Sequence, residues 1–403
     1  MCKNAKIRFL LIFVIVITFS VKGNSQSMYG AYGIGEIRYF STVRAIGMGG
    51  GGLALADPLS QNHVNPALWI YLDNVSYSGG LMSEGLNFEK NSKSFSSKQT
   101  SLNSFTFSVK AGSRIALGAG LGPFSDKDYS FETQNDNYLR SVEGYGGLSS
   151  LYFGAAYKIS NLLAFGINYS YIFGADYEDW VLDFVNDEFA DSYVDILTQK
   201  SGGNLSLGLS VEPTQRFRIG GVFQSSMKLK AEKKVATAED NAEDIFIPDF
   251  EIPFSYGIGI EAVINNRLKM IGDYYFWQYE ELKVFEGELL QNFRNTSRIS
   301  AGFEFDPSNN VSDRFPRSLV YRFGAYYQPL YYGDETGLES NEKFLTAGVS
   351  LPFNDNFARC DIGLELGIRS SNSDVFGDEK IIRAFLGISG SEIWFINRGG
   401  FRN

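Results

Sequence analysis

The chain has 403 residues and contains 34 Phe, 23 Tyr, 4 Trp, 43 Gly and 10 Pro, a composition that excludes disorder, collagen and a low-complexity scaffold. Its single histidine, His63, and its two cysteines, Cys2 and Cys360, are too few for a zinc site, an iron–sulfur cluster, a disulfide framework or a Cys–His dyad. We therefore expect no metal, no cofactor and no enzymatic activity. A formal net charge of −10 also disfavours nucleic-acid binding, because it would repel a phosphate backbone.

The N-terminal segment is typical of a secretory signal peptide. Basic residues precede an apolar run from 9 to 19, and Gly23 and Ser25 place small residues at the −3 and −1 positions of a cleavage site. We predict that residues 1–25 are a signal peptide. The alternative is an N-terminal membrane anchor, which is disfavoured because the run is shorter than the ~18 residues that a spanning helix needs.

The rest of the chain has no apolar run long enough for a transmembrane helix, and its apolar residues instead alternate with polar ones. The period is two residues, which is typical of strands with one apolar and one polar face. The alternation is clearest in the segments 163–173, 204–212, 298–305 and 361–369. Because lipid offers the backbone no hydrogen-bond partners, such strands can span a membrane only as a closed barrel.

Segments of this kind start near Val75, Leu102, Arg114, Leu148, Leu162, Asn204, Phe217, Pro253, Arg267, Arg298, Ser318, Lys343, Ala358 and Lys380. Short connections, at 111–113, 160–161, 213–216, 265–266 and 354–357, alternate with long ones, at 85–101, 125–147, 174–203, 229–252, 280–297, 331–342 and 370–379; the exception is 306–317. A soluble β-sandwich shares the side-chain alternation, but short periplasmic turns alternating with long external loops are typical of an outer-membrane barrel. We therefore predict an all-β fold, a transmembrane antiparallel up-and-down β-barrel of fourteen strands, over residues 74–403.

Fourteen strands enclose a bore too wide for barrel side chains alone to fill, so we expect an internal plug. Residues 26–73 precede the first strand, contain many glycines and lack a long alternating segment. We predict that these residues form an N-terminal plug, or hatch, inside the barrel.

The predicted plug contains a recognisable pattern in the segments 32–36 (YGIGE), 44–57 (RAIGMGGGGLALAD) and 65–67 (NPA). It resembles the N-terminal hatch of the long-chain fatty acid transporter (FadL) family, in which a segment R-A-x-G-x-G-G-A-G-x-A is followed by N-P-A. Weaker similarity extends to 322–327, 344–350, 361–367 and 392–395; Gly51 stands where the family often has Ala, and the middle of the chain matches no ligand-contact pattern. The residues that carry the plug motif are Arg44, Gly47, Gly49, Gly50, Asn65, Pro66 and Ala67.

The resemblance implies a fourteen-stranded barrel with its N-terminal segment inside, acting as an outer-membrane channel for uptake of small hydrophobic molecules such as fatty acids. Relatives of this barrel also serve secretion or assembly machines, so a non-transporting accessory subunit is the alternative. An enzyme, such as a membrane lipase, is the third. A continuous apolar tunnel would favour transport, whereas a lumen filled by plug side chains would favour the accessory role. The expected partners are outer-membrane lipid and lipopolysaccharide, a hydrophobic ligand and other outer-membrane proteins.

Two features of the plug have alternative interpretations. The glycine run at 49–52 lacks the Lys-Ser/Thr ending, the preceding strand and the following helix of a phosphate-binding loop, which favours chain compaction in a confined bore. His63 lies outside any Ser and Asp motif and is interpreted as a hydrogen-bonding residue of the plug rather than a general base.

Charged residues on the polar faces point into the lumen if the apolar faces contact lipid. Because buried ions need partners, we expect arginine–carboxylate pairs with the plug, as a structural network rather than a substrate relay. The expected lumen charges are Glu261, Arg298, Glu304, Arg322, Asp361, Glu365 and Arg369. The predicted external loops at 174–203 and 229–252 are rich in Asp and Glu, which suit hard cations, but without a calcium-loop motif a solvated surface is favoured.

The predicted third strand contains a candidate lateral gap. Gly118, Gly120 and Gly122 alternate on its inward face, and Pro123 follows them. Because proline cannot donate to a barrel ladder, we expect a bulge or kink at which a gap between strands would let a hydrophobic ligand leave sideways. The alternative is that Pro123 lies at the outer end of the strand and starts the loop.

Overall fold

The structure is a computed structural model that describes residues 27–39, 41–90, 93–185, 190–237, 243–282, 293–308, 315–333, 339–353, 357–371 and 377–393. The predicted signal peptide, residues 1–25, lies outside the described residues. Among the helices of the described ranges, none has the length and hydrophobicity needed to cross a membrane.

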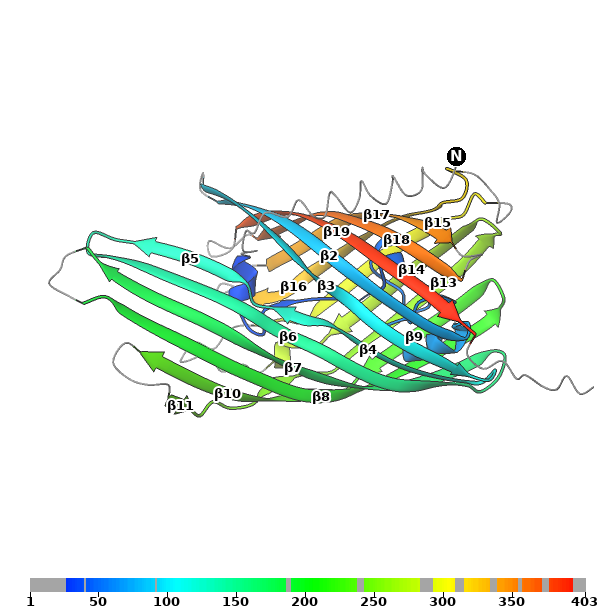
Figure 1. The fold of residues 1–403 in the computed structure, drawn as a ribbon, viewed down its shortest axis with the longest axis horizontal. Helices are drawn as coiled ribbons and strands as arrows, with labels where there is room; N and C mark the ends of the chain where they lie inside the picture. The colour runs from blue at the N-terminus through cyan, green and yellow to red at the C-terminus, as the bar shows by residue number, and fades with distance from the viewer. Residues whose placement is uncertain are drawn as a thin grey trace, which may run out of the picture.

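The wall of the molecule is one antiparallel sheet that closes on itself (Figure 1). The last strand, β19, pairs with the first wall strand, β2, from Asp378↔Glu89 to Glu392↔Val75. In chain order the wall segments are β2 (Val75–Lys90), β3 (Lys93–Ala111), β4 (Ile115–Asp126), β5 (Tyr129–Gln134), β6 (Tyr138–Lys158), β7 (Leu163–Phe184), β8 (Ser192–Thr214), β9 (Phe217–Gln224), β10 (Met227–Thr237), β11 (Glu243–Ile245), β12 (Phe250–Ile252), β13 (Ser255–Asn265), β14 (Leu268–Trp277), β15 (Thr296–Phe305), β16 (Val320–Gly333), β17 (Glu339–Phe353), β18 (Ala358–Ser371) and β19 (Asp378–Glu392).

Several of these segments are parts of the same spanning strand. β4 and β5 both pair with β6, and β9 and β10 both pair with β8. β11 and β12 pair with β10, while β13 pairs with β9, so these three segments also lie along one strand. The wall therefore has fourteen spanning strands, which confirms the predicted all-β barrel.

The side chains of the wall alternate as the sequence predicts, with apolar groups outside and polar groups inside. On β7, Phe165 and Ile167 are exposed on the outer surface, whereas Asn168 is buried toward the lumen. On the neighbouring β8, Leu207 is exposed and Ser206 is buried. This arrangement is the reverse of a soluble sandwich, and it is the lipid-facing surface of an outer-membrane barrel.

The prediction of long external loops is wrong for several connections, because the strands continue through them. β5 and β6 meet at a turn at 135–137, and β7 and β8 extend to Phe184 and from Ser192, so most of the segments 125–147 and 174–203 are hairpins. Figure 1 shows β5, β6, β7 and β8 extending as a long sheet beyond the ends of β2 and β3. Where a hairpin extends outside the membrane, neither of its faces contacts lipid. Its side chains therefore need not alternate between apolar and polar, and the period-two pattern in the sequence disappears.

The N-terminal segment folds inside the barrel (Figure 1). It contains the 3₁₀ turn η1 (Met28–Ala31), the short strand β1 (Glu36–Ile37), the single helical turn α2 (Val43–Ile46) and the 3₁₀ helix η2 (Pro66–Tyr71). Thr42 caps α2 by accepting a hydrogen bond from the Ala45 amide. Asn65 caps η2 in the same way, with Pro66 at its first position, where the missing amide hydrogen costs nothing. The short η3 (Tyr279–Glu281) follows β14.

Candidate functional site

A closed ring of buried ions fixes the plug to the wall on the side of the short turns. Arg44 of α2 donates two hydrogen bonds of 2.8 Å to Glu304 of β15, and Glu304 accepts a further bond of 2.7 Å from Arg322. The ring alternates in charge through Arg44, Glu304, Arg322, Asp361, Arg359 and Asp57 and returns from Asp57 to Arg44 at 3.3 Å. Three guanidinium groups therefore balance three carboxylates, which removes the penalty of an isolated buried charge.

Asp57 shows the effect of this ring on the plug. Burial alone would raise the pKa of the Asp57 carboxyl, but Arg359 and Arg44 hold that pKa well below its usual range. Asp57 also accepts a hydrogen bond of 2.9 Å from the Leu59 amide. The Asp57 carboxylate is therefore ionised. It connects two parts of the plug, through Arg44 and Leu59, and it also joins the plug to Arg359 of β18.

A second ionic network holds β1 toward the opposite end of the lumen. Glu36 accepts hydrogen bonds of 2.8 Å from Arg369 and 3.0 Å from Arg383. Arg38 donates bonds of 3.0 Å to Glu84 of β2 and 3.0 Å to Asp126 of β4. Although burial opposes it, the guanidinium groups of Arg369 and Arg38 lower the pKa of Glu36. β1 and the adjacent Arg38 are thus fixed to wall strands on several sides of the bore.

Glycines of the wall let the plug approach the sheet at van der Waals distance. A Cβ atom at Gly324 of β16 would lie 2.3 Å from the carbonyl carbon of Met48, and one at Gly302 of β15 would lie 2.3 Å from the Met48 oxygen. Within the plug motif, Gly49 (φ 90°) and Gly50 (φ 69°) adopt the left-handed conformation that favours glycine. The glycine run of the plug and the glycines of the wall therefore lie in close contact because neither carries a side chain that would separate them.

The remaining motif residues pack in the same manner. Gly47 faces the backbone of Gly348, where an added Cβ would lie 3.0 Å from the Gly348 Cα. The Asn65 side chain donates hydrogen bonds of 2.7 Å to the Leu53 oxygen and 3.0 Å to the Leu209 oxygen of the wall. Ala67 is fully buried. The motif residues thus lie at contacts within the plug or between plug and wall.

All seven expected lumen charges are buried inside the barrel. Besides those in the networks above, Glu261 pairs with Arg218, and Glu365 lies 3.5 Å from Arg383. Arg298 donates a hydrogen bond of 3.2 Å to the Gly49 oxygen and stacks on Tyr326 at 3.5 Å from the ring centroid. Of these contacts, only that of Arg298 with Gly49 reaches the plug, whereas the two ion pairs join neighbouring wall strands.

Several members of the networks were not identified from the sequence. Alternation along β17, β18 and β19 would have placed Glu342, Arg359 and Arg383 on the inward face with Asp361 and Glu365. The plug residues Glu36, Arg38 and Asp57 carry no such signal, because the plug has no repeating pattern. Asp273 was also missed; it accepts hydrogen bonds from the Gly52 and Leu53 amides at 2.9 and 3.0 Å.

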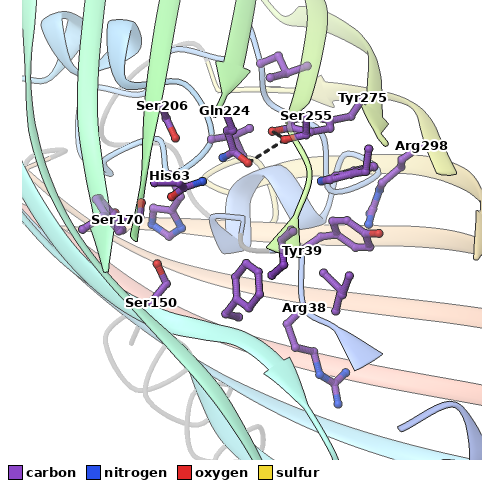
Figure 2. Close-up of a pocket in the computed structure, with 18 of the residues that line it drawn as sticks. Arg38, Tyr39, His63, Ser150, Ser170, Ser206, Gln224, Ser255, Tyr275 and Arg298 are labelled. Carbon is purple, nitrogen blue, oxygen red and sulfur yellow. Dashed lines mark hydrogen bonds between the residues drawn. The ribbon is translucent and has the colours of Figure 1, made fainter. Parts of the chain in front are cut away.

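The space left between plug and wall includes a cavity of about 170 Å³. Figure 2 shows Ser150, Ser170 and Ser206 on one side of it and Tyr39, Tyr275 and Arg298 on another. Asn168, Asn204, Gln224 and Ser255 add further hydrogen-bonding groups to its lining. A second cavity of about 60 Å³ shares the plug residues 37–39 with the first. Apolar side chains, among them Phe124, Ile172 and Trp277, also line the larger cavity, so its lining combines an apolar surface with hydrogen-bonding groups.

His63 of the plug also lines the larger cavity. Burial lowers the pKa of the His63 imidazole to about 3, so the ring is neutral near pH 7. No group of three or more His, Cys, Asp or Glu side chains in the described ranges could hold a metal ion.

The wall has a seam between β3 and β4–β5, which we define as the boundary between residues 93–104 and 122–134. β3 pairs with β4 only from Phe105↔Leu121 to Ala111↔Ile115, whereas it pairs with β2 as far as Lys93. Among the described strands, β5 pairs with β6 alone. In Figure 1 the outer ends of β2 and β3 turn away from β5 and β6. The plug crosses this seam, since Arg38 contacts both Glu84 and Asp126.

The candidate gap residues lie next to the seam. Pro123 is inside β4 opposite Ser149, and the register shifts between Pro123 and Ser125, so the strand bulges there and does not end. A Cβ at Gly118 would lie 2.5 Å from Nε2 of Gln61, and one at Gly120 would lie 2.4 Å from the Tyr152 hydroxyl. Gly122 is buried within the same strand. Gly118 and Gly120 therefore face side chains of the plug and the wall. The part of β4 that lacks pairing with β3 begins after Leu121.

The acidic residues assigned to external loops lie mainly on strands. Asp176 is buried and pairs with Lys200, and Glu178 lies 2.8 Å from Lys127. Asp187, Glu188, Glu239 and Asp240 fall outside the described residues. The expectation of a solvated acidic loop is therefore wrong for Asp176 and Glu178, because each carboxylate pairs with a buried lysine side chain.

The geometry defines a class of protein: an outer-membrane β-barrel whose lumen is occupied by an N-terminal plug. A family model described as BamG matches residues 1–399. Because the match spans nearly the whole sequence, the chain belongs to the BamG family. No curated protein sequence matches it.

Solved structures with the same fold include transporters. The toluene transporter TodX of Pseudomonas putida is 15% identical, with 93% of this chain and 100% of that chain covered and a TM-score of 0.61. The Ralstonia pickettii toluene transporter TbuX is 18% identical, with 87% and 98% covered and a TM-score of 0.59. A Pseudomonas aeruginosa FadL homologue is 12% identical, with 88% and 98% covered and a TM-score of 0.57. At these identities the likeness shows the FadL-like fold alone.

Proposed function

We propose that the chain is an accessory barrel subunit of an outer-membrane assembly machine. The observation that carries the proposal is the filled lumen, because two ionic networks and the backbone contacts at Met48 hold the plug against the wall. Membership of the BamG family supports the same role. Residues 1–25 would serve as the signal that delivers the chain, and its apolar outer surface would contact outer-membrane lipid and lipopolysaccharide.

Purification from native outer membranes in mild detergent tests this role. We expect quantitative mass spectrometry to find another outer-membrane barrel of the assembly machine in fixed stoichiometry with the chain. Recovery of the chain alone, with a fatty-acid-like molecule in fixed stoichiometry instead, would contradict the proposal.

Uptake of a hydrophobic molecule is the second candidate function, and the seam is the observation that favours it. Pro123 and Phe124 line the larger cavity and lie where the pairing of β3 with β4 has ended, so a small apolar molecule could pass from the cavity to the bilayer. Cells without the chain would then take up labelled toluene or oleate more slowly. Equal uptake with and without the chain would remove this candidate.

A further inference from the structure

The edge of β3 that faces the seam has no partner strand at two defined positions. Ser96 and Lys98 pair with Asn87 and Gly85 of β2. On their other side, no strand of the described ranges pairs with them, since the register with β4 ends at Phe105. Backbone groups at a sheet edge readily pair with another chain.

The side chains show where this edge lies. Phe105, Phe107 and Leu102 are exposed on the outer surface of β3 and mark its apolar band. Beyond Leu102 the outward positions of the same strand include Lys98 and Ser96. A charged and a hydroxyl side chain do not suit a lipid acyl chain, so this part of the seam favours a polar occupant.

The opposite edge of the seam already accepts an added segment. Glu36 and Ile37 of β1 pair antiparallel with Asp126 and Ser125 of β4, and the Arg38 amide donates a hydrogen bond of 3.0 Å to the Phe124 oxygen. The plug thus extends the sheet by strand addition at β4. At Ser96 and Lys98, no described strand occupies the edge of β3, so the same kind of pairing is possible there.

We propose that the β3 edge at Ser96 and Lys98 binds an extended segment of another outer-membrane polypeptide by β-strand addition. The proposal rests on the accessory role proposed above and deepens it, because it names the surface and the form of the partner. Backbone pairing supplies the affinity, and the outward positions of β3 favour a partner segment with polar side chains.

The register of β3 shows which amides the partner would use. The Lys110 amide donates to the Asn74 oxygen on the β2 side, and amide direction alternates along a strand. The bulge opposite Gly80 and Leu81 shifts this alternation by one residue. The Lys98 amide therefore points to the seam, so Lys98→Pro removes a donor from the edge and keeps the hydrogen bonds to β2.

Photo-crosslinking in native outer membranes tests the proposal with the full chain. A photoreactive residue at Ser96 should crosslink to one polypeptide, and moving it to Leu102 should shift the crosslinked position by about six residues, as a strand register requires. The matched control is Asn87, which faces Ser96 but is paired on both sides, with Lys380 and Ser96. Lys98→Pro should lower the Ser96 yield about tenfold, whereas Lys98→Ala keeps the amide and should not. Heat-modifiable migration verifies that each variant folds.

Crosslinks from Ser96 to lipid only, to a second copy of this chain only, or to nothing would overturn the proposal, as would equal yields from the two Lys98 variants. These results would leave the accessory role intact if loss of the chain still slows assembly of other barrels. If loss of the chain has no such effect, the proposed function fails whatever the crosslinks show.

Discussion

At the residue scale, the plug depends on pairs of buried ions that are distant in sequence. Alternation alone puts Glu304, Arg322 and Asp361 on the lumen side, because a strand has a fixed period. Alternation cannot predict that Asp57 and Arg44 are the plug residues of this ring. The pairing of plug residues with wall residues depends on the path of an irregular chain inside the bore.

Removal of one cation from the ring tests its contribution. Arg44→Ala should destabilise the docked plug by about 3–5 kcal/mol, because Glu304 would remain buried with one of its main partners lost. The measurement is the urea midpoint at which a protease cuts the plug in the detergent-solubilised barrel.

Lys269→Ala is the matched control for that variant, since Lys269 approaches the same carboxylate only to 3.8 Å and its side chain is 37% exposed. It should change the midpoint little. Equal effects of the two substitutions would show that the ring does not hold the plug.

His63 predicts a pH dependence of plug docking. Its pKa of about 3 lies below the ordinary value of about 6.5, so an undocked imidazole binds a proton more readily than the docked one. The contribution of the neutral His63 ring to the stability of the docked plug is therefore complete above pH about 6.5, and it declines as the pH falls from there toward 3. His63→Asn should flatten this part of the urea-midpoint profile, and parallel profiles for the two proteins would contradict the burial of a neutral ring.

At the scale of elements, the ends of strands near the short turns were predicted well and the opposite ends were not. Val75, Phe217 and Ala358 start their strands as predicted, whereas β6 and β8 begin at Tyr138 and Ser192, well before the predicted starts at Leu148 and Asn204. Lipid enforces alternation only within the apolar band, and the hydrogen-bonded hairpins outside it carry no such constraint.

The fit between plug and wall depends on glycine at defined positions. Gly324→Leu should displace the segment around Met48, because even a Cβ there would lie 2.3 Å from plug backbone. Single-channel recordings should then show a higher conductance than the unmodified barrel, since the bore loses part of its filling.

Gly221→Leu is the control, because an added Cβ at this position meets nothing closer than the Gly257 oxygen at 3.9 Å. Its conductance should equal that of the unmodified barrel. A Gly324→Leu barrel that folds and conducts no more than this control would argue against a plug held by close backbone contact.

At the scale of the whole molecule, the strand ends define an orientation. β19 ends beside the start of β2 at Glu392↔Val75, on the side of the short turns, which are periplasmic in outer-membrane barrels. A membrane-impermeant thiol reagent on intact cells should therefore label Asn137→Cys in the β5–β6 turn and leave Ser160→Cys unlabelled. Cys360 is buried and gives a low background. Labelling of Ser160→Cys alone would invert the topology.

In the proposed function, a plug-filled barrel of the BamG family assists the assembly of other outer-membrane barrels. The most direct measurement is pulse-chase of newly made outer-membrane barrels, followed by heat-modifiable migration, in cells with and without the chain. The account predicts slower folding of these barrels without the chain, restored by the unmodified chain and by Gly221→Leu, with uptake of hydrophobic molecules unchanged. Unchanged folding rates together with reduced uptake would contradict it and establish a channel instead.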